Sequence, residues 1–268
     1  MEPNNLFSIH RIILLTKQSL IINKKLIAIS VVGLSGAIFF ILMFLQLRST
    51  IIRWDNSDYM TIFNYFFIAL GIIYSGLSFP AFRSKERSID YLLLPASVAE
   101  KYIFEILTRI VVFILIFPLL FWVFSNLEGV ILHNFVPELI NYKFSLWQGF
   151  SEILHKKMNV GLIDWWVWLL TIQGVLFLLI APFTGASHFK KSPLLKTLFT
   201  FTIIIVGYAV LTYFLVIVLN TQGYEPKNGK VLFFNVGNNL PSIFAIAITV
   251  INLCLMTIAW FRLKEKEV

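Results

Sequence analysis

The residues best suited to chemistry are sparse in this sequence, and only one close pair of them lies inside an apolar run. Glu105 and Arg109 are four residues apart in a stretch of mostly apolar side chains. On a helix this spacing places both on one face, where they can form an ion pair. We therefore expect a structural ion pair or an interfacial anchor. The alternative role, in ion coupling, would require charged groups at membrane depth.

Other reactive groups do not assemble into a recognisable catalytic pattern. The four histidines, His10, His133, His155 and His188, are far apart, and Cys254 is the only cysteine. The sequence contains no His-Glu-x-x-His, no Gly-x-Ser-x-Gly and no P-loop, so the usual metalloprotease, nucleophile-elbow and ATP-hydrolysing sites are missing. We expect no catalytic residue, no metal site and no cofactor bound by this chain.

The elements that carry these residues are predicted to be membrane helices. Of 268 residues, 58% are hydrophobic and 13% are charged, which is too apolar for a soluble domain of this size. Runs of about 20 apolar residues are long enough to cross a bilayer as helices. We predict an all-α integral membrane protein with a single transmembrane domain over residues 1–268. Its six spans are expected at about 26–47, 60–82, 104–125, 165–187, 197–219 and 242–261.

The distribution of Lys and Arg predicts the orientation. Fifteen of the 22 Lys and Arg residues fall on the side that holds both chain ends, and seven fall on the other side. Because cytoplasmic connections are enriched in Lys and Arg, both termini are expected in the cytoplasm. The net charge of +8 lies in short clusters between apolar runs, a pattern that argues against a nucleic-acid partner.

The first 25 residues precede the first predicted span and show a polar stripe. His10, Lys17 and Lys24 recur every seven residues, as do Arg11, Gln18 and Lys25. We predict an amphipathic helix in contact with membrane lipid at the cytoplasmic interface, with Arg11, Lys17, Lys24 and Lys25 on its polar face. A frayed cytoplasmic tail is the alternative.

The connection between the second and third predicted spans has the layout of a short helix on the cytoplasmic face. A charged stretch precedes Tyr91-Leu92-Leu93-Leu94-Pro95-Ala96-Ser97. Ser97 is placed to cap the next helix, with Glu100 at the capping-box position. Exposed charges here could meet a partner protein. An ordinary turn with a solvated charge run is the alternative.

Two segments resemble a known family. Glu86-Arg87 followed by Tyr91 to Ser97 and Glu100-Lys101 is similar to the coupling region of ABC-2-type transporter permeases, in the form common in Bacteroidota. The stretch from His188 to Thr197 resembles the loop before the fifth span in the same group. The amphipathic start, the six predicted spans and the inward-facing ends agree with this family along the whole chain.

The resemblance implies a permease subunit of an exporter in the bacterial cytoplasmic (inner) membrane. Such a subunit forms a homodimer or heterodimer and is energised by a separate ABC-type ATP-binding protein, which holds ATP and Mg²⁺. A short coupling helix between spans 2 and 3 would receive the force. The residues implied at the ATPase-coupling interface are Arg83, Lys85, Glu86, Arg87, Asp90, Tyr91, Pro95, Glu100 and Lys101. Of these, Glu100 and Lys101 would fix the start of the third span.

Two other classes of function remain open. An ion-coupled carrier or channel would move its substrate without ATP, but the predicted spans contain few charged residues. A membrane scaffold or sensor built around the long outer segment 127–164 would transport nothing. The sequence does not identify the substrate or the direction of transport.

Overall fold

The chain folds into helices throughout the part that the computed structural model describes. The residues described are 8–48, 54–83, 89, 91, 96–135, 143–149, 165–189, 192–218 and 240–267. The helical elements in chain order are α1 (Ile9–Arg48), α2 (Asn56–Gly76), η1 (Pro80–Arg83), α4 (Val98–Ile106), η2 (Leu107–Val111), α5 (Val112–Phe135), α7 (Trp165–His188), α8 (Pro193–Val218) and α9 (Leu240–Glu267). No strand occurs among these residues.

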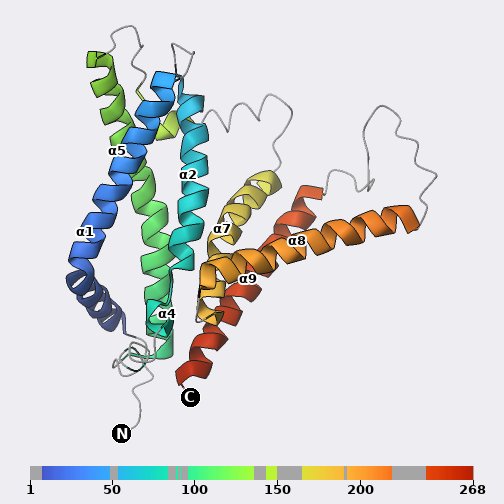
Figure 1. Ribbon diagram of the computed structural model, residues 1–268. Helices are drawn as coiled ribbons and strands as arrows, with labels where there is room; N and C mark the ends of the chain where they lie inside the picture. The colour runs from blue at the N-terminus through green and yellow to red at the C-terminus, as the bar shows by residue number, and fades with distance from the viewer. Residues whose placement is uncertain are drawn as a thin grey trace.

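Five helical stretches within the described residues are long and apolar enough to cross a membrane. They are Ile9–Arg48, Asn56–Gly76, Val98–Phe135, Trp168–His188 and Ser242–Lys266. This pattern of helices is that of a multi-pass membrane protein. The predicted fifth span, 197–219, falls on α8, whose described apolar part is the shorter stretch Pro193–Ile203. Figure 1 shows α8 projecting sideways from the other helices.

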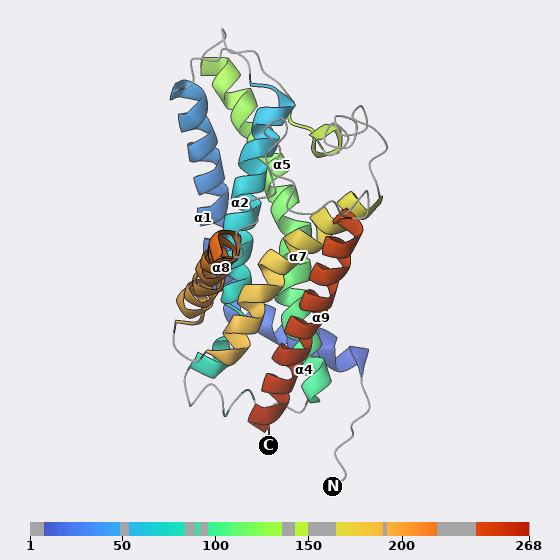
Figure 2. The same cartoon turned by 90° about the vertical axis from the view of Figure 1, so that its right-hand side faces the viewer.

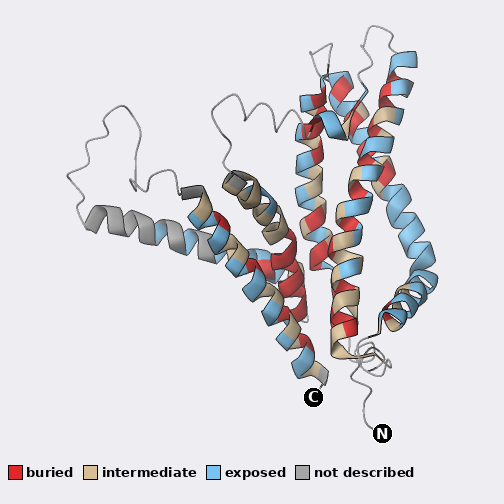
Figure 3. Cartoon of the chain, turned by 180° about the vertical axis from the view of Figure 1, so that it is seen from behind, coloured by how far each residue is buried: buried red, intermediate tan, exposed pale blue. Residues whose placement is uncertain are grey.

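The first helix is longer than the sequence suggested. Instead of an interfacial helix over 1–25 followed by a separate span, α1 runs without interruption for 40 residues from Ile9 to Arg48. Forty helical residues are about 60 Å long, twice the roughly 30 Å of a bilayer core. The helix bends, and its amino-terminal part crosses the base of the bundle (Figure 2). That part is largely exposed (Figure 3).

Local capping explains why the second helix is shifted from the predicted span of 60–82. Asp55 caps α2 in a capping box with Asp58, so the helix begins at Asn56. The hydroxyl of Ser57 donates to Asp55 and lowers the pKa of its carboxyl. At the other end, Phe79 adopts φ 51° just before Pro80. A helix cannot continue through that conformation, and residues before proline are restricted.

The third helical stretch extends beyond its predicted limits of 104–125. It runs from Val98 to Phe135 and is formed by α4, η2 and α5. The intervening η2 is a π-helix of five residues. As a result, residues that the sequence placed in the outer connection, including Glu128, belong to a helix that could enter the membrane.

Aromatic rings spaced four residues apart hold α2 against α5. Phe63 and Phe67 on α2 face Phe113, Phe117 and Phe121 on α5. The Phe67–Phe113 and Phe63–Phe121 centroids are 5.2 and 5.3 Å apart, within the usual range for aromatic pairs. Because lipid removes the hydrophobic drive between helices, close packing of this kind must supply much of the association.

A glycine brings α7 close to α2. A Cβ atom added at Gly71 would lie 2.5 Å from Leu179 Cδ2 and 3.0 Å from Phe113 Cε1. Gly71 and Ser75, one turn apart on α2, are both buried. Gly33 on α1 has no neighbour within 4 Å of its added Cβ, so none of the described residues approaches it closely.

These two glycines provide a matched test of the packing. We expect Gly71→Leu to lower the melting temperature strongly, because overpacking a tight helix contact costs about 1–3 kcal/mol. Gly33→Leu places the same side chain in open space and should change the melting temperature little. Thermal unfolding of the two variants in one detergent measures the difference. Equal destabilisation would contradict the α2–α7 contact.

Candidate functional site

α4, which follows the predicted coupling segment, lies at the end of the molecule where α1 begins and α9 ends (Figure 1). Arg83 closes η1 and is exposed. Tyr91, Glu100 and Lys101 are described as well, and the last two are buried. The remaining predicted interface residues fall outside the described part of the chain: Lys85, Glu86, Arg87, Asp90 and Pro95. The coupling helix itself therefore stays a prediction.

Glu100 joins the beginnings of two helices. Ser97 caps α4, and its backbone N–H donates to Glu100 Oε2 at 2.8 Å, which completes the capping box predicted from the sequence. The other carboxylate oxygen accepts the backbone N–H of Ser8, the residue preceding α1, at 2.7 Å. Arg11 Nη1 lies 3.8 Å from Oε2. The Glu100 side chain is fully buried, so one carboxylate satisfies donors at both helix N-termini.

A chain of ring and ammonium contacts lies beside this junction. Lys101 Nζ is 5.5 Å from the centroid of the Tyr91 ring, and Tyr91 packs edge-on against Phe82 at 5.7 Å. Lys266 Nζ lies 3.8 Å from the centroid of the Phe82 ring and donates to the carbonyl of Ser187 at 2.8 Å. Both ends of the predicted coupling segment are therefore attached to α4, α7 and α9.

The expected pair of Glu105 and Arg109 forms, and it serves the turn after α2. Arg109 Nε lies 3.7 Å from Glu105 Oε2, and the same oxygen accepts the backbone N–H of Phe79 at 3.3 Å. The guanidinium also sits 5.3 Å from the Tyr74 ring centroid. The Tyr74 hydroxyl donates to the Thr108 carbonyl at 3.2 Å, inside the π-helix η2. These contacts confirm the predicted ion pair and attach it to the turn after α2.

The basic stripe of the amino-terminal helix divides into two parts. Arg11 turns inward toward Glu100. Lys17, Lys24 and Lys25 are exposed on α1. This separation fits a helix with one end tied to the bundle and a charged face left open to water or lipid headgroups.

Sequence reasoning missed a buried acid at the opposite end of the bundle. Glu128 on α5 is completely buried. Its Oε2 accepts from Gln46 Nε2 at 3.3 Å, and Gln46 also donates to the Tyr59 hydroxyl at 2.6 Å. Glu128 Oε1 has no hydrogen-bond partner among the described residues. The apolar run Val130-Ile131-Leu132 after Glu128 was the available sign that the helix continues.

The described residues do not gather His, Cys, Asp or Glu side chains into a group of three that could hold a metal ion. At the end of the molecule where α1 begins and α9 ends, buried charged groups and aromatic contacts connect several helices. Comparison with known proteins adds no identity, since no family model, curated protein or solved structure matches the chain.

Removing the Glu100 carboxylate should release the start of α1. In Glu100→Ala the partly buried N–H groups of Ser8 and Ser97 lose their acceptor, at a cost of about 0.5–1.5 kcal/mol for each hydrogen bond. We expect faster hydrogen–deuterium exchange in residues 8–25, measured by mass spectrometry. Glu265→Ala is the control, because its pair with Arg262 is largely exposed and contributes little. Unchanged exchange in Glu100→Ala would contradict the junction.

Proposed function

We propose that this chain is the membrane subunit of an ABC-2-type transporter, an exporter powered by a separate ATP-binding protein. The ATPase docks on the segment from Arg83 to Lys101 and transmits the force of nucleotide-driven closure to the membrane helices. This chain contributes the pathway and the coupling contacts, while ATP and Mg²⁺ bind on the partner. The resemblance of that segment to the family's coupling motif is the starting point.

The observation that carries the proposal is the attachment of both ends of this segment to the bundle. Before it, Phe82 is held beneath Lys266 of α9. After it, Glu100 is bonded to the start of α1 and to Ser97. Because both ends of the segment contact the membrane helices, a displacement of the segment would also displace those helices. A solvated turn has no need of a buried Lys101 and a buried Glu100 at its end.

Contacts one turn further along α4 extend the path into the bundle. The Tyr102 hydroxyl donates to the carbonyl of Met256 on α9 at 2.7 Å, and its ring packs 5.4 Å from Trp260. Thr184 on α7 in turn donates to the carbonyl of Leu255 at 3.1 Å. Displacement of α4 would therefore act on α9 and α7 together.

In this proposal the chain crosses the bacterial inner membrane six times, and both of its termini lie in the cytoplasm. α8 would be the fifth of the six spans; its 26 residues form a helix about 39 Å long, enough to cross the bilayer core. Exposed apolar side chains along it, such as Phe199 and Val210, need lipid or another subunit. A second permease subunit, identical or related, packs with this one in the assembled transporter.

Charge reversal at the coupling segment tests the docking. In Glu86→Lys and Arg87→Glu we expect recovery of the ATP-binding protein with the tagged chain to fall at least about tenfold, or about 1.4 kcal/mol, since like charges would face each other across the interface. The assay is purification from native membranes in mild detergent, followed by mass spectrometry.

Lys143→Glu is the matched control for Arg87→Glu. It reverses one exposed basic residue on the predicted outer side and should leave recovery unchanged. An absent ATP-binding protein in the wild-type preparation, or recovery unaffected by reversal at residues 86 and 87, would count against the proposal.

Glu128 favours a second candidate function, an ion-coupled carrier. Ionisable residues buried within membrane helices commonly mark proton and cation pathways. Gln46 and Tyr59 connect it to α1 and α2, so a change in its charge would be felt by three helices. Glu128 lies outside the spans predicted from the sequence, so it was not counted among their few charged residues.

Proton movement separates the two candidates. Under the leading proposal, liposomes containing this chain alone and an internal pH dye should respond to a pH step like empty liposomes. A carrier would show faster equilibration that Glu128→Gln abolishes, because the amide keeps the shape and loses the titrating proton. Faster equilibration with that dependence would replace the ATP-driven proposal with the ion-coupled one.

A further inference from the structure

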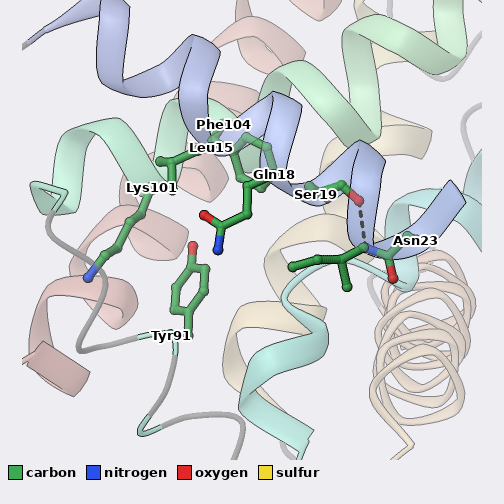
Figure 4. A pocket seen from close by; sticks show the side chains of 8 residues that line it. Leu15, Gln18, Ser19, Asn23, Tyr91, Lys101 and Phe104 are labelled. Carbon is green, nitrogen blue, oxygen red and sulfur yellow. Dashed lines mark hydrogen bonds between the residues drawn. The ribbon is translucent and has the colours of Figure 1, made fainter.

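A small open cavity lies between the amino-terminal part of α1 and the start of α4. Its volume is about 180 Å³, and its lining combines two kinds of side chain. Polar groups come from Gln18, Ser19, Asn23, Tyr91 and Lys101, and apolar surface comes from Leu15, Ile22 and Phe104. In Figure 4 the Gln18 amide and the Tyr91 hydroxyl point toward one another, while the Lys101 ammonium points away from this pair and lies 5.5 Å from the Tyr91 ring centroid.

The chemistry of this lining suits a phosphoryl group. The amides of Gln18 and Asn23, the hydroxyls of Ser19 and Tyr91 and the ammonium of Lys101 are all hydrogen-bond donors. The nearest acid on α4, Glu100, already accepts from two backbone N–H groups and faces Arg11. Lys25 follows Gln18 by seven residues on the same face of α1 and is exposed. An anion entering the cavity would meet these donors, with the exposed ammonium of Lys25 on the same helix face.

The apolar residues at the same cavity indicate which phosphoryl compound fits. Ile22 is 70% exposed. On the same face of α1, one and two turns further along, Leu26 and Ile29 are 66% and 73% exposed. In a helix that crosses the base of a membrane bundle, such side chains enter the acyl region. A phosphate bound beside them would carry its hydrocarbon chains into the same layer.

We propose that this cavity binds the headgroup phosphate of an anionic phospholipid of the cytoplasmic leaflet. The lipid fills the space between α1 and α4 and stabilises the amino-terminal helix against the bundle. Basic pockets between helices on the cytoplasmic side are a known mode of lipid recognition. The inference requires the membrane orientation given above but is independent of any ATP-binding partner.

Native mass spectrometry of the full-length protein tests the site. The detergent-purified chain is titrated with phosphatidylglycerol and, in parallel, with phosphatidylcholine. We expect tighter binding of phosphatidylglycerol by the wild type. Gln18→Glu places a negative charge at the cavity without disturbing a buried residue. It should weaken phosphatidylglycerol binding about fivefold, the effect of roughly one charge near the headgroup.

His10→Glu is the control, because it makes the same charge change on the exposed surface of α1 about two turns away. It should leave the affinity close to that of the wild type. Equal affinity for the two lipids, or equal weakening by Gln18→Glu and His10→Glu, would overturn the proposal. Displacement of phosphatidylglycerol by inorganic phosphate at matched concentration would overturn the lipid source and assign the cavity to a soluble phosphate.

Discussion

The shared carboxylate of Glu100 is the constraint on which the base of the molecule depends. Two helices begin within hydrogen-bonding distance of it, and each brings unsatisfied N–H groups and the positive end of a helix dipole. One acid meets both demands. The carboxylate fixes the start of α1 against α4. It therefore also fixes where the chain enters the membrane, next to the segment that is proposed to receive force.

Short-range chemistry was the part that the sequence predicted well. The capping box at Ser97 and Glu100 and the pair at Glu105 and Arg109 both depend on spacings of three or four residues, and helical geometry alone determines them. The long-range partners were not predictable. Glu100 bonds to Ser8 and Glu105 bonds to Phe79, and nothing in a single sequence indicates which distant N–H group a carboxylate will meet.

The limits of the helices were predicted less well, for an equally physical reason. Hydropathy detects where apolar residues occur, but helices continue or stop according to caps and prolines. α1 continues through its polar stripe because no residue there breaks it, whereas α2 stops before Pro80. Glu128 was missed because a polar residue near the end of an apolar run looks like the start of a loop. Its burial depends on Gln46 and Tyr59, which come from other helices.

The π-helix at Leu107–Val111 governs which way α4 faces. A wide turn accommodates one more residue than an α-helical turn, and each helical residue advances the direction of the side chains by about 100°. The residues on either side of η2 are thus set out of phase with a regular helix. This offset lets α5 direct its phenylalanines toward α2 while α4 directs Glu100 toward the start of α1. Loss of a single residue from this turn would rotate one of these two faces away from its partner, although every side chain involved would still be present.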